Sequence, residues 1–208
     1  MVSEAPIADK NSSSARSRRG NFSTRKDEVL RTAARLFSEY GFNQTRLEDV
    51  GEALHITRPA LYRYAKSKDE LVSLCIDIAA DQVRDAVVAA LRHQTGREQL
   101  VAFFRRYAEI MCDDFGRCLI LVQRRREIGA ADVERSRLGK REIDVSIREM
   151  VCRGAADGSL KAADPVVVSR ALFGVFNNIP GWYRPGEALR PSQIAEDFLV
   201  LMLSGLAP

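Results

Sequence analysis

Apolar positions along most of this chain recur at intervals of three and four residues, the spacing that places side chains on one face of an α-helix. From Asn21 to Tyr40 this pattern predicts a first helix, and Gly41 follows as a residue that can adopt the left-handed conformation of a C-terminal cap. Strict alternation of apolar and polar residues, which is typical of a half-buried strand, is not found. The pattern therefore predicts an all-α protein.

Two short helices are expected next, separated by a tight turn at residues 54–56. Thr45 is placed to cap the first of them, and Leu47 and Val50 point inward from it. Thr57 is placed to cap the second, with Pro59 tolerated in the first turn of that helix. Two short helices that meet across a turn are the elements of a helix-turn-helix.

A strong helix start follows at Ser67, because Glu70 three residues later completes the S-x-x-E pattern of a capping box. The helix that begins there is expected to continue to about Leu91. Helical periodicity then predicts further helices over residues 97–114, 117–128, 131–156, 165–178 and 191–206. About nine helices are therefore expected.

Composition and charge change this picture in one respect. Hydrophobic residues make up 46% of the 208 residues and charged residues 29%, as in ordinary globular proteins. The net charge of +4 is concentrated at the front, since residues 1–68 carry 13 Lys/Arg against 8 Asp/Glu and the remainder is nearly neutral. This distribution favours a nucleic-acid-binding module near the N-terminus, because Lys and Arg neutralise phosphates.

Residues 1–21 are rich in serine and contain a basic cluster but almost no large apolar side chains, so they are expected to form a disordered basic arm. The longest strongly apolar stretch, Phe198–Leu203, is far too short to cross a bilayer, and the N-terminus has no signal-peptide core. A cytoplasmic protein without a membrane partner is therefore expected.

Several classes of chemistry lack support in the sequence. The four cysteines form no C-x-x-C pair and are interpreted as reduced core thiols. His55 and His93 lie far apart, without neighbouring metal-ligand patterns, so no metal is expected. No nucleophile–base pair has a supporting motif, which argues against an enzyme and against a resident cofactor.

The second helix of the helix-turn-helix carries the groups that major-groove recognition needs, while Leu61 points inward. Here the stretch TRLEDVGEALHITRPALYRYAKSKDEL, from Thr45 to Leu71, resembles the DNA-binding signature of TetR-type bacterial regulators. The resemblance implies a DNA-binding domain over residues 22–68 and a ligand-binding and dimerisation domain over residues 69–208. It also implies DNA contacts by Thr45, Arg46, Thr57, Arg58, Pro59, Ala60, Tyr62, Arg63, Tyr64 and Lys68.

Two residues depart from the family pattern. His55 stands where the family usually has glycine, and histidine tolerates positive φ better than most residues. Ala65 replaces the usual phenylalanine, so either a neighbouring side chain compensates or the DNA-binding domain is looser.

The last two helices are apolar nearly all round and must be buried on every side. A two-fold homodimer with a four-helix bundle satisfies this requirement, and the family resemblance implies the same. The residues expected at the interface are Leu172, Gly174, Phe176, Phe198, Leu201 and Met202. Two recognition helices on one dimer predict a palindromic double-stranded DNA operator.

The segment from Asn177 through Trp182-Tyr183-Arg184-Pro185-Gly186 resembles the ending of TetR members that control fatty-acid, steroid and aromatic-acid catabolism. Those members commonly respond to acyl-CoA thioesters, which implies a repressor released from its operator by such an effector. The expected effector contacts are Phe103, Phe104, Tyr107, Met111, Phe115, Arg124, Asn177, Trp182 and Arg184. Two alternatives stay open: a TetR-type repressor of an efflux or stress gene induced by a hydrophobic or aromatic compound, and a helical interaction protein without DNA binding.

Overall fold

The computed structural model describes residues 10–124, 130–186 and 188–204, with the side chains of 10–23, 124 and 130–133 left out. Every regular element in these ranges is a helix, which confirms the predicted fold class. The helices are α1 (Lys10–Tyr40), α2 (Leu47–Ala53), α3 (Arg58–Leu61), α4 (Lys68–Ala90), α5 (Gly96–Cys112), α6 (Asp114–Arg124), α7 (Ala130–Ala156), α8 (Pro165–Phe176), α9 (Ile179–Trp182) and α10 (Pro191–Ser204). The single turn of α9 is the one helix that the sequence pattern did not indicate.

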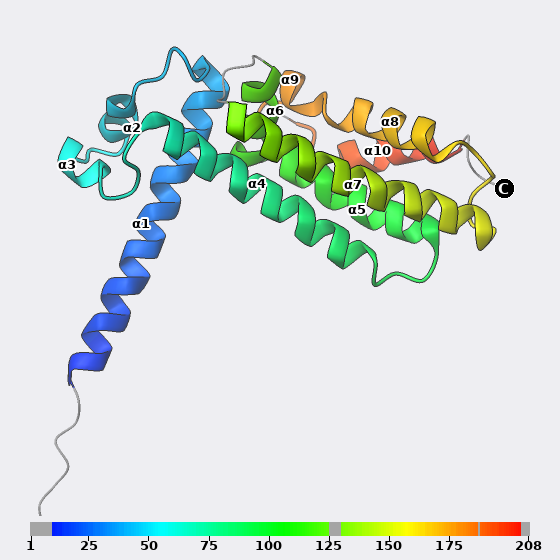
Figure 1. The fold of residues 1–208 in the computed structure, drawn as a ribbon, viewed down its shortest axis with the longest axis horizontal. Coiled ribbons are helices and arrows are strands. Elements are labelled where there is room, and N and C mark those ends of the chain that lie inside the picture. The colour runs from blue at the N-terminus through cyan, green and yellow to red at the C-terminus, as the bar shows by residue number, and fades with distance from the viewer. Residues whose placement is uncertain (1–9, 125–129, 187, 205–208) are drawn as a thin grey trace, which may run out of the picture.

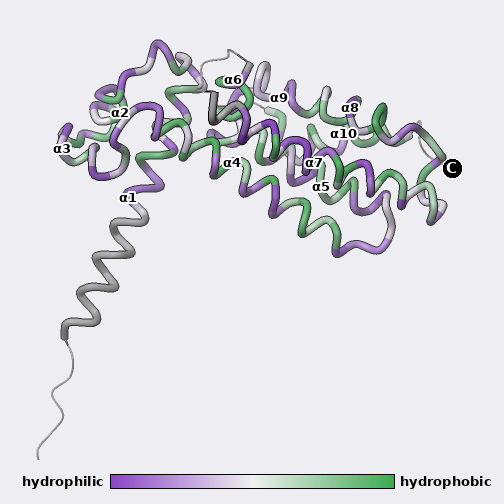
Figure 2. Tube along the Cα trace, in the orientation of Figure 1, coloured by the Kyte–Doolittle hydropathy of each residue, from purple (hydrophilic) through white to green (hydrophobic). Residues whose placement is uncertain are grey.

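The molecule has a small head and a longer body (Figure 1). The C-terminal part of α1 lies with α2 and α3 at one end, and α4 runs from this head into the bundle formed by α4–α8 and α10. Along α4 and α5, hydrophobic and hydrophilic residues alternate in the manner of amphipathic helices (Figure 2).

The first helix begins earlier than the sequence predicted. Residues 10–21 were expected in a disordered arm, but they continue α1, which extends away from the body in Figure 1. Residues 10–21 contain no proline, and their alanine, lysine and arginine residues are good helix formers. The rest of the predicted arm, residues 1–9, lies outside the described residues.

Two hydrophobic cores meet on α4. The head core contains the inner faces of α1 to α3 and residues of α4 as far as Ala79, whereas the body core begins at Val83 on the same helix. Phe115 on α6 also belongs to the head core, and the guanidinium of Arg31 on α1 lies 5.0 Å from the centre of its ring. Arg31 also pairs with Asp113 at 2.8 Å, so the head is packed directly on the body.

Two of the predicted helix starts are made by hydrogen-bonded caps. The Ser67 hydroxyl accepts from the backbone N–H of Glu70 at 3.1 Å, while the Glu70 carboxylate accepts from the N–H of Lys66 rather than Ser67. At the start of α8, the Asp164 carboxylate accepts from the N–H groups of Val166 and Val167. Side-chain oxygens thus satisfy helix donors that have no intrahelical partner.

The expectation of four buried thiols is correct for three cysteines and wrong for one. Cys75, Cys112 and Cys118 are buried and reduced, and burial raises the pKa of the Cys112 thiol to about 12. Cys152 is exposed on α7. A lone cysteine near the end of a long amphipathic helix can occupy either face, so its apolar neighbours in the sequence did not decide its position.

The start of α5 lies so close to α7 that only glycine fits. A Cβ atom at Gly96 would lie 2.1 Å from the backbone nitrogen of Gly154 and 2.4 Å from the carbonyl oxygen of Met150. Both neighbours are backbone atoms of α7, so neither can move aside without shifting the helix. The close approach of α5 and α7 therefore depends on Gly96.

We predict that Gly96→Ala lowers the free energy of unfolding by about 3 kcal/mol, because overpacking forces the two helix backbones apart. Gly139→Ala is the matched control, since a Cβ there meets no atom within 4 Å and alanine favours the helix interior by about 1 kcal/mol. Chemical denaturation of both variants measures these changes. Equal stability of the two variants would contradict the close packing.

Candidate nucleic-acid interface and ligand cavity

The turn between α2 and α3 is closed by backbone hydrogen bonds. The N–H of Ile56 donates to the carbonyl oxygen of Gly51 at 3.0 Å, and a Cβ at Gly51 would lie only 3.2 Å from the Ile56 carbonyl oxygen. His55 adopts φ 53°, the positive value that this position of the turn requires. The helix-turn-helix therefore forms with histidine in the place of glycine.

The residues of the predicted reading surface lie around the single turn of α3. Leu61 is 1% exposed and anchors α3 in the head core. The remaining side chains are exposed or half-buried: Thr57, Arg58, Pro59, Ala60, Tyr62, Arg63 and Tyr64. Arg46 at the start of α2 is exposed as well. The fold thus gathers these residues at the end of the head, away from the body (Figure 1).

Arg58 is held in place by two neighbours. Its Nε lies 3.3 Å from a Glu48 carboxylate oxygen on α2, and its Nη2 donates to the Tyr62 hydroxyl at 3.2 Å. The guanidinium carbon also lies 5.5 Å from the centre of the Tyr62 ring. Hydrogen bonding to Tyr62 and the charge of Glu48 raise the pKa of Arg58. The side chain is thus positioned before any ligand binds, and it keeps unused donors.

Thr45 differs from its predicted role. It is 2% exposed, and its hydroxyl donates to the carbonyl oxygen of Gly41 at 2.8 Å. The N-cap of α2 is Arg46, whose backbone N–H donates to Asp49 at 2.7 Å. This hydrogen bond holds the pKa of the Asp49 carboxyl below its usual value. The prediction that Thr45 caps α2 is therefore wrong, because a polar residue before a helix can also turn inward and donate to a loop carbonyl.

Ala65 and Lys68 lie between the end of α3 and the first turn of α4. Ala65 is buried in the head core, together with Phe42 from the loop after α1. The Lys68 ammonium donates to the carbonyl oxygen of Phe42 at 2.8 Å and lies 4.3 Å from the centre of its ring. Lys68 thus ties the start of α4 to the loop after α1, and its ammonium retains two further donors.

The body contains a cavity of about 470 Å³ between α4, α5, α6, α7 and α8. Apolar side chains from four of these helices line part of its wall: Ile76, Ala80, Val83, Leu119, Ile120, Ile143 and Phe173. A cavity of this size and lining is typical of a small-molecule site.

Only part of the predicted effector set lines this cavity. Tyr107 and Asn177 do, and the Tyr107 hydroxyl donates to the Asn177 side-chain oxygen at 2.6 Å. Burial raises the pKa of Tyr107 well above its usual value, so this phenol remains a donor. The two residues join α5 to the end of α8 at the cavity wall.

The other predicted effector residues do not line the cavity, as far as the described side chains extend. Phe103, Phe104 and Met111 are buried in the body core, and Phe115 lies in the head core. An aromatic stripe at helical spacing predicts burial, but it does not distinguish a packed core from a cavity wall.

Two predicted effector residues lie at the surface, and a third cannot be placed. Trp182 is exposed and its ring meets that of Phe198, while Arg184 donates to the carbonyl oxygen of Tyr183 at 3.0 Å. The side chain of Arg124 lies outside the described residues.

The cavity has a charged lining that the sequence analysis missed. Six basic residues reach it, namely Arg84, Arg135, Lys140, Arg141, Arg148 and Arg170, against the two acidic residues Asp77 and Asp144. Several of them belong to α7, where cavity-lining positions recur at helical spacing from residue 135 to residue 148. That periodicity is visible in the sequence, but a charged helix face ordinarily faces solvent.

The predicted dimer residues divide into two groups. Leu172 and Phe176 are buried in the body core of the single chain. Phe198 and Met202 are half-buried against the same core, whereas Leu201 is 73% exposed. Gly174 faces open space, since a Cβ there would meet no atom within 4 Å.

An exposed apolar face nevertheless remains on the last helices. Val167 on α8 is 63% exposed, and Val200 on α10 is 67% exposed beside Leu201. Exposure of several large aliphatic side chains to water is unfavourable, and it is typical of a surface that binds another protein.

Within the described residues, none of the helices combines the length and apolar character needed to span a membrane. Nor do histidine, cysteine, aspartate and glutamate side chains gather in a group that could hold a metal ion.

Comparison with known protein families identifies both parts of the chain. Residues 29–75 match the family described as bacterial regulatory proteins, tetR family. Residues 93–206 match the tetracyclin repressor-like C-terminal domain. The second match alone spans more than half of the chain.

Individual relatives extend over nearly the whole length. The HTH-type transcriptional repressor KstR2 of Mycolicibacterium smegmatis is 27% identical over 195 residues, which are 88% of this chain and 91% of the relative. The solved structure of the ketosteroid transcriptional regulator KstR2 of Mycobacterium tuberculosis superposes with a TM-score of 0.79 at 20% identity, covering 88% and 95% of the two chains. AibR in complex with isovaleryl coenzyme A and operator DNA superposes with a TM-score of 0.74 at 19% identity, covering 86% and 98%.

Proposed function

The chain belongs to the TetR family of bacterial transcriptional regulators, and from this premise we propose that it is a homodimeric repressor released from a palindromic operator by an acyl-CoA thioester. A TetR-family regulator is a DNA-binding repressor and not an enzyme. The finer proposal rests above all on the cavity between α4 and α8, which combines apolar walls with an excess of basic side chains.

For DNA binding, we assign the reading role to the exposed residues around α3 within residues 22–68. We assign contacts with base edges to Arg58 and Arg63, together with Thr57, Pro59 and Ala60. We assign contacts with the phosphate backbone to Arg46, Tyr62, Tyr64 and Lys68. Thr45 is left out of this set because its hydroxyl is used inside the head. A guanidinium can bind guanine O6 and N7 together, which is the commonest specific contact in the major groove.

For assembly, we assign the dimer interface to the exposed faces of α8 and α10. Val167, Val200 and Leu201 supply apolar area there, and Gly174 permits a second helix to approach closely. A two-fold axis through this face forms a four-helix bundle from two helices of each chain. The same axis presents two α3 segments to one face of DNA.

For effector binding, both parts of a coenzyme A thioester, its phosphates and its acyl chain, suit the lining of the cavity. Its phosphates need cationic partners, and arginine is well suited to bind them. The acyl chain needs an apolar channel, which Ile76, Val83 and Phe173 help to line. The relative AibR, whose structure contains isovaleryl coenzyme A and operator DNA, has the same fold. We place effector binding and dimerisation together in residues 69–208.

A second candidate effector is a neutral hydrophobic or aromatic compound, as expected for a repressor of an efflux or stress gene. The observation that favours it is the apolar wall beside Tyr107 and Phe173, whose rings lie 5.5 Å apart. The basic lining argues for the thioester, because a neutral ligand would bring no negative charge to match the excess of basic over acidic side chains.

We predict that Arg63→Ala weakens binding to an operator duplex ten- to hundredfold, because it removes a bidentate base contact. The duplex is first selected from a random pool by the wild-type protein, and binding is measured by fluorescence anisotropy at several salt concentrations. Arg92→Ala, an exposed arginine outside the head, is the control and leaves affinity unchanged. Equal affinity of the Arg63 variant and the wild type would remove Arg63 from the interface.

We predict that Leu201→Glu converts the dimer to a monomer at micromolar concentration, because the new carboxylate would be buried without a partner. Leu138→Glu is the control, since Leu138 is also an exposed leucine but lies on α7. Sedimentation velocity distinguishes the two states. A wild-type protein that sediments as a monomer, or a dimeric Leu201 variant, would contradict the proposed interface.

We predict that octanoyl-CoA binds the purified protein and releases the operator duplex, whereas coenzyme A alone is at least tenfold weaker because it buries no acyl chain. Calorimetry measures binding, and anisotropy measures release. By linkage, the duplex lowers the affinity for the thioester by the same factor. Absence of heat and of release with short, medium and long acyl chains would refute the thioester proposal. Release by a neutral aromatic compound alone would support the second candidate.

A further inference from the structure

Two buried hydrogen-bond donors in the cavity wall have no partner within the described part of the chain. They are Nε2 of Gln123 on α6 and Nε of Arg148 on α7, and both residues line the cavity. A buried donor without an acceptor costs free energy, so each such group in a folded protein calls for an explanation. One explanation is a ligand that brings an oxygen acceptor to each of the two donors.

The orientation of the Gln123 side-chain amide is fixed by a neighbouring residue on α7. The Lys140 ammonium donates to the side-chain oxygen of Gln123. This contact sets the orientation of the amide, because an ammonium cannot accept a hydrogen bond. The NH₂ group of Gln123 must therefore point elsewhere. Burial lowers the pKa of Lys140, which is one of the six basic residues that line the cavity.

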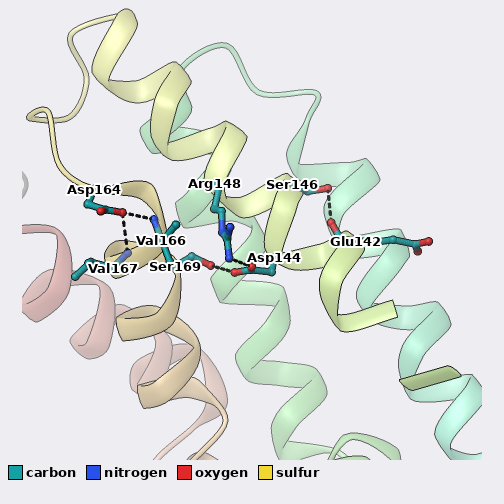
Figure 3. Close-up of polar contacts among 8 residues, drawn as sticks. All are labelled: Glu142, Asp144, Ser146, Arg148, Asp164, Val166, Val167 and Ser169. Atoms are coloured by element: carbon teal, nitrogen blue, oxygen red, sulfur yellow. Dashed lines mark hydrogen bonds and ion pairs between the residues drawn. The ribbon is translucent and has the colours of Figure 1, made fainter. Parts of the chain in front are cut away.

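The second donor belongs to a network that joins α7 to α8. One guanidinium nitrogen of Arg148, Nη2, binds the Asp144 carboxylate, whose other oxygen accepts from the Ser169 hydroxyl at 2.5 Å. Figure 3 shows Asp144 between these two partners, with Arg148 on the same helix and Ser169 on α8. The network holds the guanidinium in place by Nη2, while Nε remains unpaired.

The two donors are separated along the cavity. Gln123 lies at the level of Lys140, which precedes Arg148 by eight residues on α7, or about 12 Å of helix at 1.5 Å per residue. Between these positions the cavity is lined by Ile143 and also by the charged residues Arg141 and Asp144, of which Asp144 already binds Arg148. The cavity thus offers two donors at different levels of α7, and apolar side chains such as Ile120, Ile143 and Phe173 belong to the same wall.

We propose that the effector is an elongated molecule that carries an oxygen acceptor near both ends of an apolar middle, bound by Gln123 at one end and Arg148 at the other. This inference rests on the cavity being the effector site. It deepens the proposed function, since a thioester carbonyl supplies one acceptor and the acyl chain must carry a second one, such as a carboxylate. The excess of basic lining residues favours an acidic group over a neutral one.

The test compares two probes of equal chain length, decanedioate and decanoate, by calorimetry on the full chain. Decanedioate is expected to bind ten- to hundredfold more tightly, the effect of one added hydrogen bond to a charged group. Arg148→Lys keeps the charge beside Asp144 but loses the Nε donor, so it is expected to abolish the preference. Gln123→Glu keeps an acceptor for Lys140 but loses the free donor, and it is expected to do the same.

Gln123→Glu also has a readout that needs no ligand. Removal of the unpaired donor and formation of an ion pair with Lys140 are expected to raise the melting temperature of the ligand-free protein. Gln193→Glu is the matched control, since the side-chain oxygen of Gln193 accepts from the N–H of Arg190 at an exposed site outside the cavity. This control is expected to change neither the preference nor the melting temperature.

Equal binding of the two acids, or no binding of either, would overturn the two-acceptor proposal, whatever octanoyl-CoA does to the operator. A preference for decanedioate that both variants abolish would support it, even if no thioester releases DNA. In that case the identity of the effector as a thioester would fail, while the two donors would remain its binding groups.

Discussion

The packing of α1 on α6 sets the position of the DNA-reading helices relative to the rest of the molecule. Phe115 of α6 is buried in the same core as α1, α2 and α3, and Arg31 on α1 contacts both its ring and the Asp113 carboxylate. The ion pair itself is partly exposed and contributes little to stability. The buried aromatic surface contributes more, because apolar area removed from water is the main source of stability in such a core. A shift of α6 would therefore move the head as well.

The long helix α4 makes the second connection between head and body. Its first turns belong to the head core, and its remaining buried residues, from Val83 onward, belong to the body core beside the cavity. Ile76 and Val83 lie on the cavity wall, while Ile76 also belongs to the head core. A ligand in the cavity would thus contact the helix that carries the reading head. This arrangement supplies a physical route for coupling, since both sites bias the position of one rigid element.

The cavity and the surface of α8 and α10 both contain groups that a lone, empty subunit satisfies poorly. Gln123 and Arg148 each hold a buried donor without an acceptor, and Leu201 exposes most of its side chain to water. Each feature costs stability in isolation. Such local costs are common at functional sites, where binding of a ligand or a second subunit removes them. Ser169 on α8 donates to Asp144, which binds Arg148, so α8 carries part of the cavity network as well as the exposed Val167.

The sequence by itself determined the helical class, the boundaries of the best-capped helices and the helix-turn-helix. Ser67 and Asp164 cap helices through contacts with residues two or three positions away, so local sequence suffices to identify them. The turn at His55 was equally readable, because its backbone conformation is set within a few residues. These features depend on short-range geometry.

Only the tertiary structure decided which apolar stripes form a packed core and which polar residues face inward. Phe103 and Phe104 have the spacing of a ligand wall but lie in the core, whereas charged residues of α7 line the cavity. Thr45 points inward, where both its hydroxyl and its backbone N–H donate to the carbonyl oxygen of Gly41. Helical periodicity shows which residues share one face of a helix, but it does not show what packs against that face. The packing partners are helices that lie far away in the sequence.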